Sequence, residues 1–172
     1  MIRNLKAVLA GTSLVTVLAC SAGEPAVTTE EPAGMAQQDV AEITAAINGV
    51  REMEAQGIGS GDLETGVAAY ADDIVFMAPD APARNGKDAV REWLAEAYEQ
   101  FDLEVNYTFS DIIVSGDWVI ERYGGEATFT PKDGGDGLVE QLKGIHIYRL
   151  QSDGTWRITH DIWNTDAPAP SM

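Results

Sequence analysis

The spacing of apolar residues is helical in the first half of the folded region. From Val40 onwards, apolar side chains recur at intervals of three and four residues until a group of glycines interrupts them, which predicts an amphipathic helix. Asp62 can cap a second helix that runs to Tyr70, and Asp88 can cap a third helix with its own apolar face. A short apolar run at residues 74–77 predicts a strand between the second and third helices.

After Asp102 the period of the pattern changes to two, which is typical of strands with one buried face. Strands are predicted at residues 103–109, 118–130, 143–150 and 156–163. The Asp153-Gly154 pair between the last two strands is a strong local signal for a hairpin. Two helices, a strand, a helix and a four-stranded meander predict an α+β fold with an antiparallel sheet.

The N-terminus has the composition of an export signal. Arg3 and Lys6 precede an apolar run at residues 7–18, which is shorter than the roughly 20 residues needed to span a bilayer. The segment "VLAC", which ends at Cys20, resembles the lipobox of bacterial lipoproteins, in which the cysteine is lipidated and becomes the first mature residue. The alternative is simple cleavage near Ala19, which would leave an exported free thiol.

These features predict a chain of several parts. Residues 20–39 are rich in Ser, Thr, Pro and Glu and carry too few apolar groups to form a core, so they are interpreted as a disordered tether. The predicted parts are a signal peptide at 1–19, the tether at 20–39, one domain at 40–166 and a flexible tail at 167–172.

The charge balance is strongly acidic. Asp and Glu number 28 against 11 Lys and Arg, a net charge of −17, and loss of Arg3 and Lys6 with the signal would leave −19. Such a charge argues against nucleic acid partners and against membrane binding by charge, so the only expected membrane contact is a lipid anchor. Neither a glycine-rich phosphate loop nor a cluster of Cys and His is present, so no cofactor and no metal are expected.

The only two histidines, His146 and His160, fall within the predicted C-terminal hairpin. Counting outwards from the turn pairs Tyr148 with Thr159 and His146 with Asp161, and directly opposed side chains share a face. The catalytic hypothesis is that Asp161 holds His146 as a general base, while the Tyr148 hydroxyl donates to a developing oxyanion. The alternative is a cross-strand pair within an ordinary core. His160 points to the opposite, aliphatic face, which argues against one metal ion bound by both histidines.

Further ligand contacts are expected from Trp93, Tyr123, Trp163 and Asn164. Trp163 shares the face of His146, whereas for Trp93, on the apolar stripe of the third helix, core packing is the competing interpretation. Glu121 and Arg122 are interpreted as a solvent-exposed pair on a strand.

Several motifs resemble one known family. The segments are "SGDLETGVAAYADDIVFM", "GKDAVREW", "SGDWVIERY" and "DGTWRITHDIWNTD", at residues 60–77, 86–93, 115–123 and 153–166. In this order they resemble the SnoaL-like branch of the nuclear transport factor 2-like superfamily, and more narrowly the domain of unknown function group numbered 4440. Asp161, Trp163 and Asn164 stand at signature positions of that group. The resemblance implies a strongly curved sheet wrapped around about three helices, which form a cone with a pocket inside.

The resemblance leaves the function open, because the superfamily includes isomerases, dehydratases, epoxide hydrolases, cyclases, ligand binders and assembly domains. We expect an exported lipoprotein, a homodimer, that binds a small, partly apolar ligand. One alternative is a cofactor-independent isomerase, dehydratase or cyclase that abstracts a proton next to a carbonyl. Another is a dimeric scaffold without catalysis.

Overall fold

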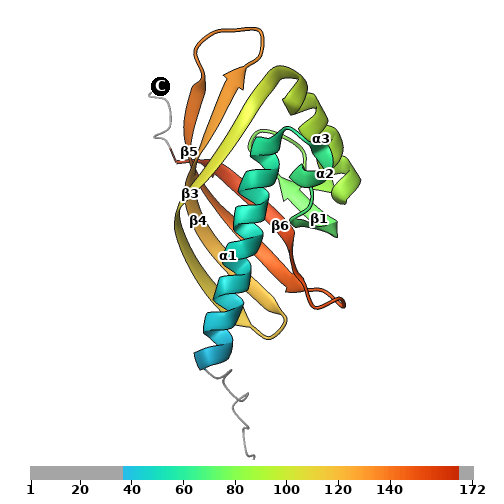
Figure 1. The fold of residues 1–172 in the computed structure, drawn as a ribbon, viewed down its shortest axis with the longest axis vertical. Helices are drawn as coiled ribbons and strands as arrows, with labels where there is room; N and C mark the ends of the chain where they lie inside the picture. The colour runs from blue at the N-terminus through green and yellow to red at the C-terminus, as the bar shows by residue number, and fades with distance from the viewer. Residues whose placement is uncertain (1–36, 167–172) are drawn as a thin grey trace, which may run out of the picture. The chain divides into compact units, whose positions relative to one another are not determined.

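The computed structural model describes residues 37–166 (Figure 1). The predicted signal peptide, Cys20 with most of the tether, and the predicted tail lie outside the described residues. Within the part of the chain that is described, no helix is both long enough and apolar enough to cross a membrane.

Three helices form in the described region: α1 (Gln37–Ser60), α2 (Leu63–Gly66) and α3 (Lys87–Gln100). Asp62 caps α2 as predicted, because its Oδ1 accepts a hydrogen bond from the Thr65 amide at 2.8 Å. The second helix is shorter than predicted, because Tyr70, its expected end, already belongs to a strand. The prediction for Asp88 was wrong. Gly86, with φ of 88°, takes the cap position, so Asp88 lies within the first turn of α3.

Six strands form one sheet among residues 37–166: β1 (Tyr70–Met77), β2 (Arg84–Asn85), β3 (Phe101–Ser115), β4 (Trp118–Pro131), β5 (Leu138–Leu150) and β6 (Trp156–Thr165). The order across the sheet is β2-β1-β6-β5-β4-β3, so the four-stranded antiparallel meander and the α+β class are confirmed. The sheet is nevertheless mixed, because β1 pairs with β6 in parallel. The predicted antiparallel arrangement therefore holds for β3 to β6 and not for the pairing of β1 with β6.

The long strands curve around the helices, as the resemblance implied. In Figure 1, strands β3 to β6 curve around α1, and α2 and α3 lie near β1 at one end of the domain. Buried side chains from the three helices and from the inner face of the sheet form one core, which includes Ile47, Val67, Ile74, Leu94, Val119 and Ile158. Several polar side chains are buried in addition to this apolar core: Glu54, Glu121, His146 and Asp161.

The β5–β6 hairpin brings His146 opposite Asp161, as predicted. Tyr148, however, pairs with Ile158 and not with Thr159. The loop between the two strands is one residue longer than the predicted turn, which shifts the pairing next to the loop by one residue. A β-bulge at Thr159 takes up the extra residue, so the pairs beyond it have the predicted register. Strict alternation from His160 would place Ile158 on the same face as His160, but the bulge turns Ile158 into the core.

Candidate functional site

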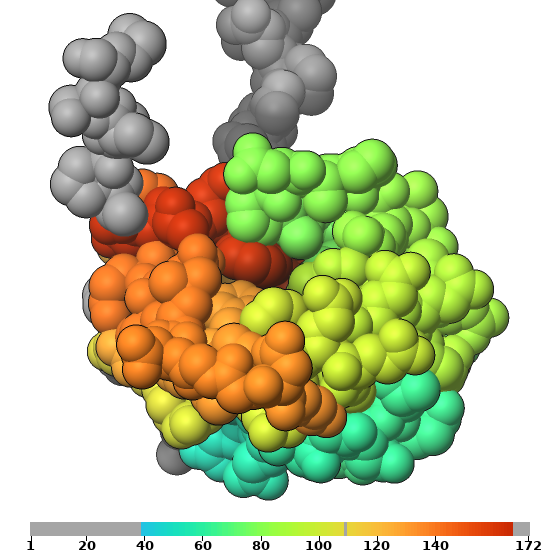
Figure 2. All heavy atoms as spheres, turned by 90° about the horizontal axis from the view of Figure 1, so that it is seen from above, coloured from blue at the N-terminus to red at the C-terminus, as the bar shows by residue number. Residues whose placement is uncertain are grey.

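A cavity of about 60 Å³ lies inside the curved sheet. Its apolar lining includes Phe76, Trp93, Leu103, Phe129, Leu142 and Trp163. Figure 2 shows the end of the domain where the surface is hollowed between the segments of β1 (green), β6 (red) and β4 to β5 (orange). Because one water needs roughly 10–15 Å³ of such space, the cavity has room for a few water molecules or for part of a small ligand.

Glu54 of α1 lies at the buried end of this cavity and is 1% exposed. Its Oε1 accepts a hydrogen bond from the Tyr70 hydroxyl at 2.8 Å, and its Oε2 accepts one from the Tyr107 hydroxyl at 2.6 Å. Burial raises the pKa of Glu54, and the positive charge of His146 opposes that rise. Sequence reasoning missed Glu54. The signal was its spacing, because it continues the buried stripe of α1 after Ile47 and Val50.

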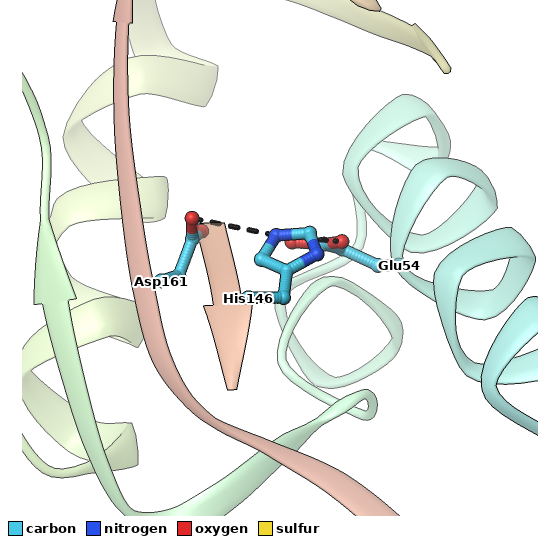
Figure 3. A group of neighbouring side chains, drawn as sticks. All are labelled: Glu54, His146 and Asp161. Atoms are coloured by element: carbon cyan, nitrogen blue, oxygen red, sulfur yellow. Dashed lines mark ion pairs between the residues drawn. The ribbon is translucent and has the colours of Figure 1, made fainter. Parts of the chain in front are cut away.

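His146 of β5 lies fully buried between two carboxylates (Figure 3). Its Nε2 is 3.4 Å from Asp161 Oδ1 and 3.6 Å from Glu54 Oε2. Its Nδ1 is 3.2 Å from Glu121 Oε2 and 3.1 Å from the Tyr148 hydroxyl. Burial alone would lower the pKa of His146, but the charges of Glu54 and Asp161, together with hydrogen bonding, raise it to about 10. The surrounding carboxylates therefore favour a positive charge at the position of this ring.

Glu121 of β4 supports the far side of that imidazole. Its carboxylate accepts hydrogen bonds from Arg51 Nη1 and Ser110 Oγ, each at 2.5 Å, and from the Tyr148 hydroxyl. The prediction that Glu121 is solvent-exposed was wrong, because its side chain is 0% exposed. The alternation of β4 contained the signal, since Glu121 stands two residues from the buried Val119 on the same face.

Asp161 of β6 is 3% exposed and lines the cavity beside Tyr123. The Tyr123 hydroxyl donates to Asp161 Oδ1 at 3.2 Å. Burial, followed by the nearby carboxylates, raises the pKa of Tyr70, Tyr107 and Tyr123 well above the ordinary value. All three phenols therefore stay protonated at neutral pH and act as hydrogen-bond donors at the buried end of the cavity.

The structure brings the three predicted catalytic residues together, but not in equivalent positions. Asp161 lines the cavity, whereas His146 lies behind it and Tyr148 packs in the core with its hydroxyl directed to Glu121. The predicted ligand contacts divide in the same way. Trp93, Tyr123 and Trp163 line the cavity, whereas Asn164 is exposed and lines a separate groove next to β5.

Three side chains from distant parts of the sequence could hold a cation together. One donor atom from each of Glu54, His146 and Asp161 lies within 4.8 Å of the other two. The set combines one imidazole nitrogen with two carboxylate oxygens, a donor set that binds a proton or a divalent metal ion.

Comparison with known proteins places this geometry in a family. Residues 50–160 match the family described as the SnoaL-like domain. A search of the curated proteins found no significant match.

Solved structures share the fold. A ketosteroid isomerase-like protein from Erwinia carotovora atroseptica is 25% identical over 72% of this chain and 96% of its own, with a TM-score of 0.62. A nuclear transport factor 2-like superfamily protein from Salmonella enterica serovar Typhimurium is 15% identical over 75% and 94%, with a TM-score of 0.68. A candidate scytalone dehydratase from Novosphingobium aromaticivorans is 15% identical over 80% and 93%, with a TM-score of 0.69. The chain shares its fold with the nuclear transport factor 2-like protein. Since the family match spans more than half of the sequence, the chain belongs to the SnoaL-like domain family.

Proposed function

We propose that the domain binds a small, partly apolar molecule in the cavity and transfers a proton on it, as an isomerase or a dehydratase does. The observation that carries the proposal is the pair of carboxylates, Glu54 and Asp161, at the buried end of an otherwise apolar cavity. Apolar walls would hold the body of the ligand, while the carboxylates and tyrosine hydroxyls orient its polar end.

Asp161 is the proposed proton acceptor. The Tyr123 hydroxyl and the His146 ring hold its Oδ1, at 3.2 Å and 3.4 Å, so the carboxylate is positioned before a ligand arrives. The role of oxyanion donor, which the sequence suggested for Tyr148, fits the tyrosines that line the cavity better. Tyr107 and Tyr70 present their hydroxyls there, although both donate to Glu54 in the ligand-free arrangement.

Two of the similar structures support the same class of reaction. One is ketosteroid isomerase-like and the other is a candidate scytalone dehydratase, at 25% and 15% identity. This support extends to the reaction class and not to a substrate, because proteins with one fold carry out many chemistries. The narrower resemblance to the domain of unknown function group 4440 remains part of the proposal.

Binding is tested by titrating small aromatic ketones and phenols into the protein and following chemical shifts by NMR. Trp93→Leu removes an indole from the cavity wall, whereas Trp118→Leu removes one that is 41% exposed outside it. We expect the Trp93 variant to lose affinity at least tenfold and the Trp118 variant to keep it. Equal affinity in the two variants would place the ligand elsewhere and overturn the proposal.

Proton transfer is tested separately, as incorporation of deuterium from D₂O at carbons next to the carbonyl of a bound ketone. We expect exchange in the wild-type protein and a loss of at least about 100-fold in Asp161→Asn, which is typical for a general base. Glu52→Gln, an exposed change on α1, is the control and should exchange normally. Ligand binding without any exchange would reject catalysis and leave the binding function standing.

We also propose that the protein is exported, that it is anchored through a lipid on Cys20, and that it forms a homodimer. The export and lipid proposals rest on the N-terminal sequence alone, and Cys20→Ser should move the protein from the membrane fraction to the soluble fraction. The dimer is supported by isoleucines exposed on the outer face of the sheet, where Ile113 opposes Ile120 and Ile145 opposes Ile162. Ile120→Glu should convert a dimer to a monomer in light scattering.

A further inference from the structure

We propose that Glu54, His146 and Asp161 form a binding site for one divalent transition-metal ion at the buried end of the cavity. The donor atoms would be Glu54 Oε2, His146 Nε2 and Asp161 Oδ1, which come from α1, β5 and β6 (Figure 3). This proposal rests on the proposed function in one respect, because both place their chemistry in the same cavity.

The donor spacing already suits a small ion. Zinc lies about 2.0–2.2 Å from imidazole nitrogen and carboxylate oxygen, so tetrahedral donors stand roughly 3.3–3.5 Å apart. His146 Nε2 is 3.4 Å from Asp161 Oδ1 and 3.6 Å from Glu54 Oε2. The remaining distance, between the two carboxylates, is at most 4.8 Å, so rotation of one carboxylate suffices to close the site.

The imidazole is oriented as it is in metal sites. Its Nδ1 faces Glu121 at 3.2 Å, an arrangement in which the carboxylate holds the Nδ1 proton and directs the Nε2 lone pair at the ion. His146 Nε2 makes no aligned hydrogen bond, and it is the only buried side-chain nitrogen or oxygen in that state among the described residues. This nitrogen lies between two carboxylates, at 3.6 Å and 3.4 Å, so release of its proton would let the three groups bind a metal ion together.

Tyrosine hydroxyls at the same end of the cavity also hold the two carboxylates in place. Tyr70 and Tyr107 donate hydrogen bonds to Glu54, and Tyr123 donates one to Asp161. Hydrogen bonds from outer groups fix the ligands in natural metal sites, where their loss weakens affinity. Each of the three proposed ligands therefore has a hydrogen-bonding partner that fixes its position.

The charge of the cluster favours a cation of more than one unit. Glu54, Glu121 and Asp161 are all buried. Arg51 pairs with Glu121, and the His146 ring lies within 3.6 Å of all three carboxylates, so two cations face three acids. Buried carboxylates require compensation, and a divalent ion between Glu54 and Asp161 supplies it for both.

The donor set indicates the kind of metal. One imidazole nitrogen and two carboxylate oxygens suit zinc, iron(II), cobalt(II) or manganese(II), whereas calcium and magnesium prefer oxygen alone. Three protein ligands leave a coordination position for an oxygen atom of a ligand in the cavity, as in catalytic metal sites. Coordination through Asp161 Oδ1 leaves its Oδ2 as the proton acceptor of the proposed function.

The test is a titration of the full chain, stripped with EDTA, with cobalt(II) in excess magnesium, which occupies the acidic surface. We expect one cobalt per chain, with visible d–d absorption, displaced by zinc. Glu54→Gln and Asp161→Asn should each weaken binding by at least tenfold. Glu52→Gln, exposed on the same helix as Glu54, and Cys20→Ser, which removes the only thiol, should bind as the wild type does. Absence of binding, or equal binding by all four variants, overturns the proposal.

A second measurement needs no variant. Zinc added to the ¹⁵N-labelled wild-type protein should shift the ring nitrogens of His146 strongly and leave those of His160 unchanged. A His146 imidazole that keeps its proton on Nε2 in the presence of zinc overturns the site. Both measurements of metal binding are made without a cavity ligand, and ligand binding is titrated separately in the EDTA-treated protein. Failure of the metal site is therefore distinguished from failure of ligand binding.

Discussion

Arg51 Nη1 lies 2.5 Å from Glu121 Oε1, so an ion pair with a fully buried carboxylate joins helix α1 to strand β4. Glu121 in turn supports the His146 ring from the side opposite to the cavity. Arg51 is thereby linked, through Glu121 and His146, to the two carboxylates of the proposed site.

Arg51→Met should strongly destabilise the protein. The substitution removes one of the two cations that face the buried Glu121 carboxylate and leaves only His146, so we expect the free energy of unfolding in urea to fall by about 3 kcal/mol. Arg122→Met is the control. Arg122 follows Glu121 on β4 and pairs with Asp111 of β3 in an exposed contact, so its loss should cost about 0–1 kcal/mol. Similar losses in the two variants would contradict a structural role for the buried pair.

The pKa of Glu121 predicts how stability depends on acid pH. Burial opposes its ionisation, but hydrogen bonds from His146, Ser110 and Tyr148 outweigh burial and lower the pKa to about 2. A carboxyl group whose pKa is lower in the folded state stabilises the fold above its ordinary pKa of 4.5 and loses that contribution as the pH falls towards about 2.

In EDTA-treated protein, the unfolding free energies of wild type and Glu121→Gln should therefore differ most above pH 4.5 and converge between pH 4.5 and about 2. Urea unfolding at a series of pH values measures the difference. Glu52→Gln, a change at an exposed position of α1, is the control for the loss of one negative charge. A difference from wild type that stays constant over this range would refute the lowered pKa of Glu121.

The parts of the fold that local sequence determines could be predicted. The alternation of apolar residues and the Asp-Gly turn were sufficient for the meander. The opposition of His146 and Asp161 was predicted correctly, but it also depends on the bulge at Thr159, which the sequence did not indicate. The parallel pairing of β1 with β6 was not predictable, because it joins segments far apart in the sequence and no local turn specifies it. The same pairing takes Tyr70 out of the second helix, so a tertiary contact overrode a helical pattern.

The candidate site was predicted only in part, for a related reason. His146 and Asp161 were found through the hairpin, whereas Glu54 and Glu121 were missed because acids are rarely buried. The helical period of α1 assigns Glu54 to the interior, and the alternation of β4 does the same for Glu121. Arg51 and the tyrosine hydroxyls compensate them only after folding, and no sequence pattern shows that these partners will be near.

Gly144→Ala should damage the site from the backbone. A Cβ on Gly144 would stand 2.4 Å from the Tyr123 ring and 2.6 Å from the Ile162 carbonyl oxygen, and the backbone cannot easily yield. We expect a loss of about 1–3 kcal/mol in unfolding free energy, typical of overpacking, and weaker ligand binding because Tyr123 moves away from Asp161.

Gly49→Ala is the matched control for that change. Gly49 lies within α1, and a Cβ there has no atom within 4 Å, so the substitution should stabilise the protein by about 0.5–1 kcal/mol through helix propensity. A destabilisation common to both variants would show that added methyl groups act through some effect other than the contact with Tyr123.

Tyr107→Phe tests whether the hydrogen bonds around Glu54 serve the cavity or only the fold. The variant removes the hydroxyl that donates to Glu54 Oε2 at 2.6 Å, and the buried oxygen left behind should cost about 1–3 kcal/mol in urea unfolding. Tyr98→Phe also removes a hydroxyl, which donates to the Ile58 carbonyl at 3.0 Å, but Tyr98 does not line the cavity. Both variants should lose stability, and only Tyr107→Phe should lose affinity for the ketones of the binding assay. If both variants lost affinity equally, the loss in Tyr107→Phe would come from the weakened fold and not from a contact between the Tyr107 hydroxyl and the ligand.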